Sequence, residues 1–196
     1  MAEAMSSFMV GDQVLKTFCA LVGVLAFVLP SAALAQTTVA SSRAAWVTQS
    51  GTVADRTSNS NTYTGDIGGD GYRSYISYAV PASATAFTSA VIRVNTEGVN
   101  FGPNDLTLYD VSSDIATATA AALYSDFGSG TVLGTITGLN TSNVTVDIAL
   151  NADGLAAVNA ARGGEISFGV AVSSTAGSDY GVFSASTGST QRELIL

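Results

Sequence analysis

Apolar and polar residues alternate along most of the chain beyond residue 71. A period of two residues is typical of a β-strand with one buried and one exposed face. In segment 72–80 this period assigns to one face Tyr72, Ile76, Tyr78 and Val80, and to the other Arg73, Tyr75 and Ser77. Alternation or a short β-rich run recurs in segments 89–95, 105–111, 131–137, 144–150, 166–172, 179–186 and 192–196. The pattern therefore predicts a protein built mainly from short strands.

One segment, which begins at Asn151, has helical spacing instead. Asn151 can cap the first turn, Leu155 and Val158 share a face, and the glycines at 163–164 end the segment. A helix of about ten residues is marginal by itself, so it must pack on the sheets. About eight or nine strands and this helix predict an all-β fold: a jelly-roll-like antiparallel β-sandwich with one short crossover helix.

The first 35 residues have the layout of a cleavable signal peptide. Lys16 precedes the apolar run 18–29, and the small-residue site Ala33-Leu34-Ala35 follows. Twelve apolar residues are fewer than the about 20 that a membrane-spanning helix needs, which disfavours an uncleaved anchor. Either Met1 or Met9 can be the start. The prediction is a secreted protein, in the periplasm, outside the cell or at its surface, with no membrane insertion after cleavage.

Removal of residues 1–35 leaves one domain at 36–196. Its beginning has the weakest pattern: residues 45–47 predict a short strand, whereas 48–64 is polar and is predicted to be irregular. The domain contains no Cys, Lys or His, since Cys19 and Lys16 leave with the signal. Catalytic triads, ordinary structural zinc sites and lysine chemistry are therefore excluded. Six arginines against thirteen acidic residues give a net charge of −7, which argues against nucleic acid and anionic membranes as partners.

Carboxylates are the only enzymatic chemistry that this composition leaves open. A glycosidase places two of them across a cleft. The candidates are Asp66, Asp70, Glu97, Asp105 and Asp110. Sequence spacing places no two of these across from each other, and surface carboxylates usually serve solubility. We therefore predict no catalytic residue and no enzymatic activity.

The segment from Asp66 to Gly71, with the sequence DIGGDG, is the sharpest local feature. Asp66 and Asp70 lie four residues apart in a glycine-rich loop. Carboxylate and carbonyl oxygens are the ligands that Ca²⁺ prefers, so the two residues are candidate ligands of a structural calcium ion. The alternative is a turn that feeds the following strand, because Asp and Gly suit turn conformations.

Aromatic residues offer a second binding chemistry, because sugar rings stack on exposed aromatic rings. Trp46, the only tryptophan, is a candidate ligand-binding residue for such stacking. The alternation points Tyr75, Tyr109 and Arg93 outward, so these three residues are predicted to form a sugar-binding surface on a sheet face. The alternative for each aromatic ring is packing in the core or at the end of the sandwich.

The run from Tyr72 to Leu196 resembles the jelly-roll modules of exported bacterial proteins, such as DNRLRE-type modules and proteins sorted by exosortase systems. The similar stretches are YRSYISYAVP with TSAVIRVNTEG, LYDVSS, and LNADGLAAVNAARGGEISFGVAV with DYGVFSAS and RELIL. The resemblance covers about two-thirds of the chain. It implies a role in extracellular matrix, at the cell surface or in contact with carbohydrate. No C-terminal apolar helix with a basic cluster is seen, so anchoring by that route is not expected.

These observations favour a secreted, non-catalytic sandwich that binds a polysaccharide or another surface polymer. A structural subunit of a surface layer, matrix or filament is the alternative, because exposed strand edges can pair with a neighbouring copy. A small carboxylate-dependent glycan hydrolase or lyase is the third hypothesis. The identity of the ligand and the oligomeric state stay open.

Overall fold

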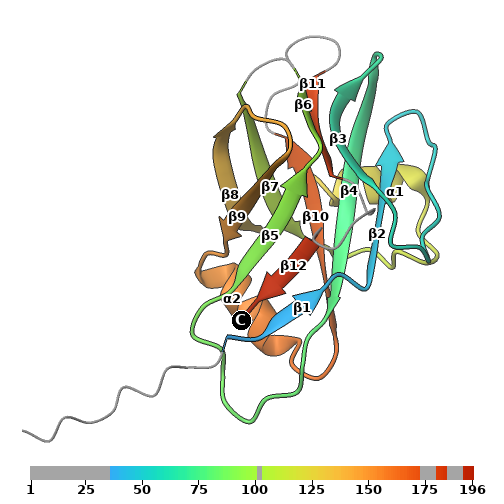
Figure 1. Ribbon diagram of the computed structural model, residues 1–196. Coiled ribbons are helices and arrows are strands. Elements are labelled where there is room, and N and C mark those ends of the chain that lie inside the picture. The colour runs from blue at the N-terminus through green and yellow to red at the C-terminus, as the bar shows by residue number, and fades with distance from the viewer. Residues whose placement is uncertain (1–35, 101–102, 173–179, 185–191) are drawn as a thin grey trace, which may run out of the picture. The chain divides into compact units, whose positions relative to one another are not determined.

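Strands dominate the chain and form two packed antiparallel sheets (Figure 1). The computed structural model describes residues 36–100, 103–172, 180–184 and 192–196, and the predicted signal peptide lies outside them. The four-stranded sheet has the order β1 (Thr38–Ala40), β12 (Arg192–Ile195), β5 (Val91–Thr96) and β9 (Val144–Ala149). The prediction of an all-β sandwich is confirmed.

The second sheet has eight strands: seven follow one another in a single path, and the eighth branches from it. Its order is β6 (Gly98–Asn100), β11 (Tyr180–Ser184), β3 (Thr62–Ile67), β4 (Asp70–Ala79), β10 (Glu165–Val172), β7 (Asn104–Asp110) and β8 (Val132–Leu139). β2 (Arg43–Thr48) also pairs with β4. Residues 36–196 form a compact unit by themselves.

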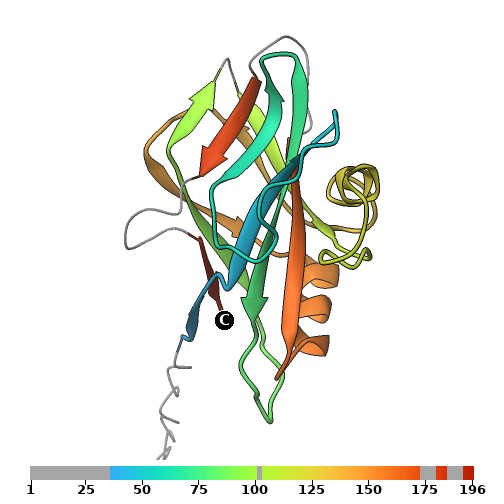
Figure 2. The same cartoon turned by 90° about the vertical axis from the view of Figure 1, so that its right-hand side faces the viewer.

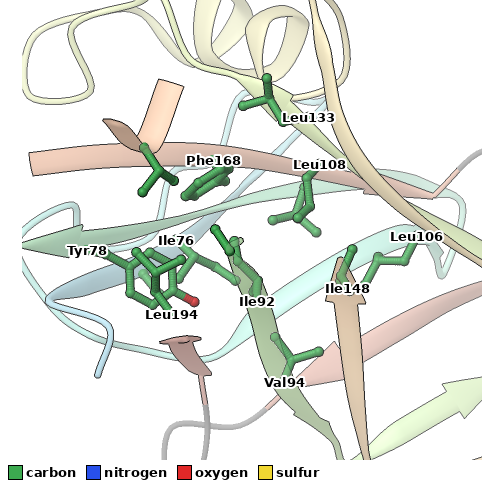
Figure 3. Close-up of a cluster of buried hydrophobic side chains, with 14 of the residues drawn as sticks. Ile76, Tyr78, Ile92, Val94, Leu106, Leu108, Leu133, Ile148, Phe168 and Leu194 are labelled. Carbon is green, nitrogen blue, oxygen red and sulfur yellow. The ribbon is translucent and has the colours of Figure 1, made fainter. Parts of the chain in front are cut away.

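The core lies between the inner faces of the two sheets (Figure 3). Ile92 of β5 and Ile148 of β9, which the alternation assigns to the inside, are at most 1% exposed. They meet Ile76, Leu108 and Phe168 from the eight-stranded sheet. Burial of such side chains is the main stabilising contribution to a domain without disulfides.

The inward face of β8 is predicted wrongly at its first residue. Val132, expected to point inward with Ile136, is 41% exposed, and Leu133 is buried instead. The pairing of β7 with β8 shifts register between Leu108 and Tyr109, opposite this point. Such an irregularity adds a residue to one strand and moves the following side chains to the other face.

The predicted crossover helix is present as α2 (Ala152–Ala160). It connects β9 of the four-stranded sheet with β10 of the eight-stranded sheet. The side chain of Asn151 accepts a hydrogen bond from the backbone N–H of Gly154 at 2.9 Å, which caps the first turn. Val158 is fully buried against the core.

A second helix, α1 (Ala120–Asp126), was not predicted. The Thr119 hydroxyl caps it by accepting from the N–H of Ala122. Both helices lie on the same side of the molecule (Figure 2). Leu123 and Phe127, four residues apart, are each 1% exposed, because they pack on the outer face of β2 and β4. The eight-stranded sheet is therefore covered on both faces in this region.

The stretch from 48 to 64 is partly regular. Residues 49–61 connect β2 and β3 mostly through turns, which agrees with the prediction of an irregular segment. The prediction is wrong for Thr62 and Thr64, which begin β3 and are buried. These threonines are polar residues on an inward face, so the segment lacks the apolar alternation from which a strand is predicted.

Candidate functional site

Three aromatic rings meet where β2, β3 and β4 lie side by side. Trp46 comes from β2, Tyr63 from β3 and Tyr72 from β4. The ring centroids of Trp46 and Tyr72 are 5.3 Å apart, those of Tyr63 and Tyr72 5.8 Å, and those of Trp46 and Tyr63 6.1 Å. Tilted and edge-to-face pairs at these distances are favourable arrangements of aromatic side chains. We call Trp46, Tyr63 and Tyr72 the three-ring cluster.

Strand pairing fixes the positions of these rings. Trp46 lies opposite Ser74 in the β2–β4 ladder, two residues along β4 from Tyr72, so both rings share one face. The hydroxyl of Ser74 donates to the backbone carbonyl of Tyr63, which ties β3 to the same part of β4. All three aromatic residues are half-buried. The three-ring cluster thus presents aromatic surface on rigid strands.

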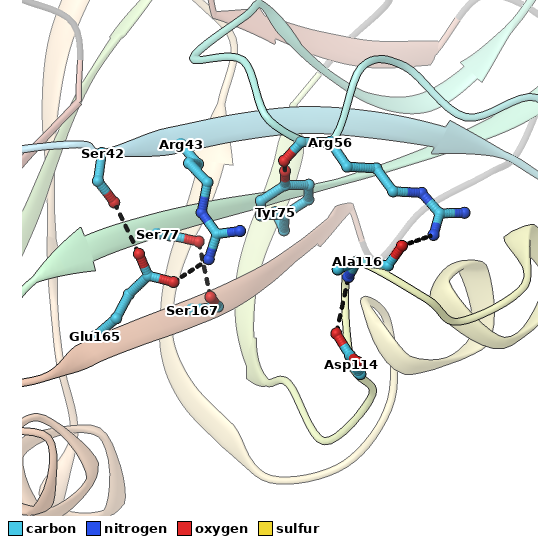
Figure 4. Close-up of polar contacts among 9 residues, drawn as sticks. All are labelled: Ser42, Arg43, Arg56, Tyr75, Ser77, Asp114, Ala116, Glu165 and Ser167. Atoms are coloured by element: carbon cyan, nitrogen blue, oxygen red, sulfur yellow. Dashed lines mark hydrogen bonds and ion pairs between the residues drawn. The ribbon is translucent and has the colours of Figure 1, made fainter.

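Tyr75 does not point to solvent, so its predicted place in an exposed binding surface is wrong. It is 2% exposed, and its ring packs on Phe127 with centroids 5.4 Å apart. Its hydroxyl donates to the backbone carbonyl of Arg56 at 2.6 Å (Figure 4). Burial raises the pKa of this hydroxyl. The alternation identified the correct face of β4, but α1 covers that face.

The segment that covers Tyr75 is held by polar contacts at its ends. Arg56 donates to the carbonyl oxygen of Ile115 at 3.1 Å. It also donates to the carbonyl oxygen of Ala116 at 2.9 Å, and Asp114 accepts from the N–H of Ala116 (Figure 4). At the far end, the carboxylate of Asp126 accepts from the backbone N–H groups of Ser112 and Ser113. The connection between β7 and β8 is therefore a packed layer of the fold.

Tyr109 and Arg93 do not join the predicted surface either. Tyr109 is half-buried on the same sheet face as Tyr75, and Gly169 of β10 lies between them in register. Arg93 lies on β5 of the other sheet and forms a bidentate ion pair with Asp147 at 2.7 and 2.8 Å. Of the four predicted ligand-binding residues, only Trp46 belongs to the three-ring cluster. Sequence alternation gives the face of a strand but not the sheet to which that strand belongs.

The predicted calcium loop forms the turn of the β3–β4 hairpin. Asp66 lies opposite Gly71, and Asp70 lies opposite Ile67, so the two carboxylates project to opposite faces of the ribbon. Asp66 accepts from the N–H of Gly69 at 3.0 Å. Asp70 accepts from the backbone N–H and the hydroxyl of Ser50. Each carboxylate thus has a role in the local backbone, and calcium binding stays a prediction.

The hydrogen bonds from Ser50 lower the pKa of the Asp70 carboxyl group, and a substitution of Ser50 can test this effect. The Ser50 hydroxyl is the largest cause that lowers the pKa of Asp70 below its ordinary value of 3.8. A depressed pKa in the folded state adds stability above the unfolded-state pKa, and this contribution is lost as the pH falls through the folded-state pKa. We expect Ser50→Ala to raise the pKa of Asp70 in an NMR titration of the carboxyl carbons. The lowered pKa of Asp114, which depends on Thr117, should not change. An unaltered pKa of Asp70 would contradict the conclusion that Ser50 lowers it.

The other candidate carboxylates also support neighbouring loops. Asp105 accepts from the N–H of Gly138 at 2.8 Å, and Asp110 accepts from the N–H of Thr131 at 2.6 Å. Both lie on β7, while Glu97 is exposed between β5 and β6. In the part of the chain that the structure describes, no three His, Cys, Asp or Glu residues gather as a metal site would require.

Tyr63 and Tyr72 are the site residues that the sequence reasoning missed. Tyr72 was assigned to the inward face of β4, and it lies on the face of Ile76 and Tyr78 but outside their buried cluster. Tyr63 lies in the segment read as irregular. The alternation of Thr62, Tyr63 and Thr64 was the available signal, since it places Tyr63 on the face opposite to the two buried threonines.

No protein-family model matches the chain, and no curated protein matches it. The resemblance to exported jelly-roll modules therefore stays a prediction. Within the described ranges, no helix is long and apolar enough to cross a membrane.

Proposed function

We propose that this protein is an exported, non-catalytic β-sandwich that binds carbohydrate at the three-ring cluster. The observation that carries the proposal is the grouping of Trp46, Tyr63 and Tyr72 on three neighbouring strands, with centroids 5.3 to 6.1 Å apart and all three residues half-buried. Such a group exposes aromatic surface without the entropy cost of ordering a loop on binding.

Sugar rings suit this surface chemically. The C–H face of a pyranose is apolar and packs on an aromatic ring, while hydroxyl groups at the rim set its orientation. The rest of the domain is acidic, with a net charge of −7 after removal of the predicted signal. A neutral polymer meets no repulsion from that charge, whereas nucleic acid would.

A non-catalytic role is part of the proposal. The support is that Asp66, Asp70, Asp105 and Asp110 all accept hydrogen bonds from backbone N–H groups of nearby turns and strands. A general acid needs a raised pKa next to the scissile bond. The pKa of Asp70 is shifted the other way, below its ordinary value.

Affinity electrophoresis of residues 36–196 through gels that contain neutral polysaccharides tests the proposal. We expect one class of glycan to retard the protein, and Trp46→Ala and Tyr63→Ala to weaken the retardation by about tenfold in Kd, the equivalent of about 1.4 kcal/mol. Tyr109→Ala is the matched control, since Tyr109 is also a half-buried tyrosine but lies outside the cluster. Parallel gels with Ca²⁺ and with EDTA report on the predicted calcium ion. Retardation that Tyr109→Ala weakens and Trp46→Ala leaves intact would contradict the proposal.

A structural subunit is the second candidate, and one observation favours it. β8 ends the eight-stranded sheet, and its eight residues, VLGTITGL, include no charged side chain. An uncharged strand edge can pair with the edge of another copy. If no glycan retards the protein and light scattering shows growth of assemblies with concentration, this function replaces carbohydrate binding.

A further inference from the structure

A small pocket lies where β3, β4 and β10 of the eight-stranded sheet meet α1. Its volume is about 30 Å³, and its lining residues are Gly65, Tyr72, Arg73, Tyr124, Ala171 and Val172. Gly65 and Ala171 contribute little or no side chain, so the pocket has room above the strands. Arg73 and Tyr72 are consecutive residues of β4 and project to opposite faces. The pocket therefore shares Tyr72 with the three-ring cluster, while its charged residue, Arg73, projects to the opposite face.

Arg73 brings a positive charge to this pocket without a carboxylate partner. Through Nη1 it donates to the backbone carbonyls of Tyr124 at 2.6 Å and Ser125 at 3.3 Å. Its guanidinium lies over the ring of Tyr124, 4.4 Å from the centroid. In the part of the chain described, no ion pair involves Arg73, and its Nε and Nη2 donate no hydrogen bond to protein. Arg43 and Arg93, by contrast, are each paired with an acidic residue.

The guanidinium is held in place by its neighbours. A methyl group added at Gly128 would lie 2.3 Å from Cζ of Arg73, so the guanidinium packs directly on that glycine. The hydroxyl of Tyr124 lies against Gly71 and makes no hydrogen bond within the described ranges. A positioned guanidinium with free donors beside a phenol hydroxyl matches the planar, two-oxygen geometry of a carboxylate.

We propose that this pocket binds the carboxylate group of an acidic sugar, such as a uronic acid. Arg73 donates to the carboxylate oxygens, and the Tyr124 hydroxyl supplies a further donor. A volume of about 30 Å³ accepts the carboxylate itself and leaves the sugar ring outside, at the surface. Tyr72 lines the pocket and also belongs to the three-ring cluster, but the donors of the proposed carboxylate site are Arg73 and Tyr124, which the cluster does not include.

An NMR titration of residues 36–196 with D-glucuronate, D-glucose and acetate tests the proposal. Glucuronate should shift the amide signals of Arg73 and of residues 124–128 in a saturable manner. Acetate, the carboxylate without the ring, should shift the same signals more weakly, and glucose, the ring without the carboxylate, should leave them in place. Equal shifts with glucose and glucuronate would overturn the proposal, and so would acetate binding as tightly as glucuronate, which would indicate a general anion site.

Two variants and a control locate the site. Arg73→Gln should weaken glucuronate binding by about tenfold or more, because it removes the charge-assisted hydrogen bonds. Arg93→Gln removes the same charge from the other sheet and should change nothing. Gly128→Ala keeps every charge but displaces the guanidinium, so it should also weaken binding, and it tests the site even if Arg73→Gln fails to fold. Unchanged affinity in Gly128→Ala, or equal losses in the two arginine variants, would refute the assignment. Neither result depends on Trp46, so a negative result for glucuronate binding does not contradict carbohydrate binding at the three-ring cluster.

Discussion

Phe168→Ala should lower the free energy of unfolding by about 3–5 kcal/mol, the range for removing a buried aromatic ring. Phe168 lies on β10, between β4 and β7, and is 0% exposed. Its ring meets that of Tyr78 edge-on, with centroids 6.1 Å apart. Because strands flank β10 on both sides, the surrounding backbone cannot collapse into the space that the ring leaves. The loss should therefore include a cavity contribution as well as the lost burial.

Urea denaturation followed by circular dichroism measures this loss. Val132→Ala is the control, because Val132 also points from a strand of the same sheet but is 41% exposed, and its removal should change stability by no more than about 0.5 kcal/mol. Similar small losses in both variants would show that Phe168 does not lie in the core between the two sheets.

Gly169→Ala should destabilise the domain by about 1–3 kcal/mol, the usual cost of overpacking. Inside a strand, replacing Gly by Ala ordinarily adds about 0.5–1 kcal/mol of stability, so the sign of the effect is informative. A Cβ at Gly169 would lie 2.7 Å from Cα and 2.9 Å from the carbonyl oxygen of Phe127. These are backbone atoms, so the end of α1 must move away from β10 and separate Phe127 from Tyr75.

Hydrogen exchange identifies which part of the domain responds. Amides of residues 111–131 should exchange faster in Gly169→Ala, while those of β5 and β9 keep their protection. Gly164→Ala is the matched control: its Cβ would meet only the Ala161 carbonyl oxygen at 3.5 Å, an ordinary contact. A more stable Gly169→Ala variant would mean that α1 does not rest on this face of the sheet.

The strands were predictable wherever apolar and polar residues alternate along the sequence. The alternation in 72–80 and 89–95 placed Ile76, Tyr78, Ile92 and Val94 inside, and the structure confirms each of them. The crossover helix was predictable because Asn151 and the two glycines at 163–164 mark its ends locally. These signals depend only on neighbours in the sequence, so no tertiary information was needed.

The binding surface was not predictable in the same way, because it depends on contacts between distant segments. Tyr75 lies on the face of β4 that the alternation predicts, but α1, about fifty residues later in the chain, buries this face. Arg93 points outward as predicted, yet from the other sheet. Tyr63 reaches Trp46 only because β2 and β3 both pair with β4. Alternation assigns faces to single strands, whereas a site requires the order of the strands in the sheets.

Trp46 allows the most direct test of carbohydrate binding at the three-ring cluster. It is the only tryptophan in the chain, so the intrinsic tryptophan fluorescence of the protein reports on this site alone. In a titration with the oligosaccharide of the glycan that retards the protein most, we expect a saturable change in emission, and Tyr72→Ala should raise the Kd by about tenfold. Saturable binding by calorimetry with no change in Trp46 emission would place the ligand elsewhere and contradict the proposed site.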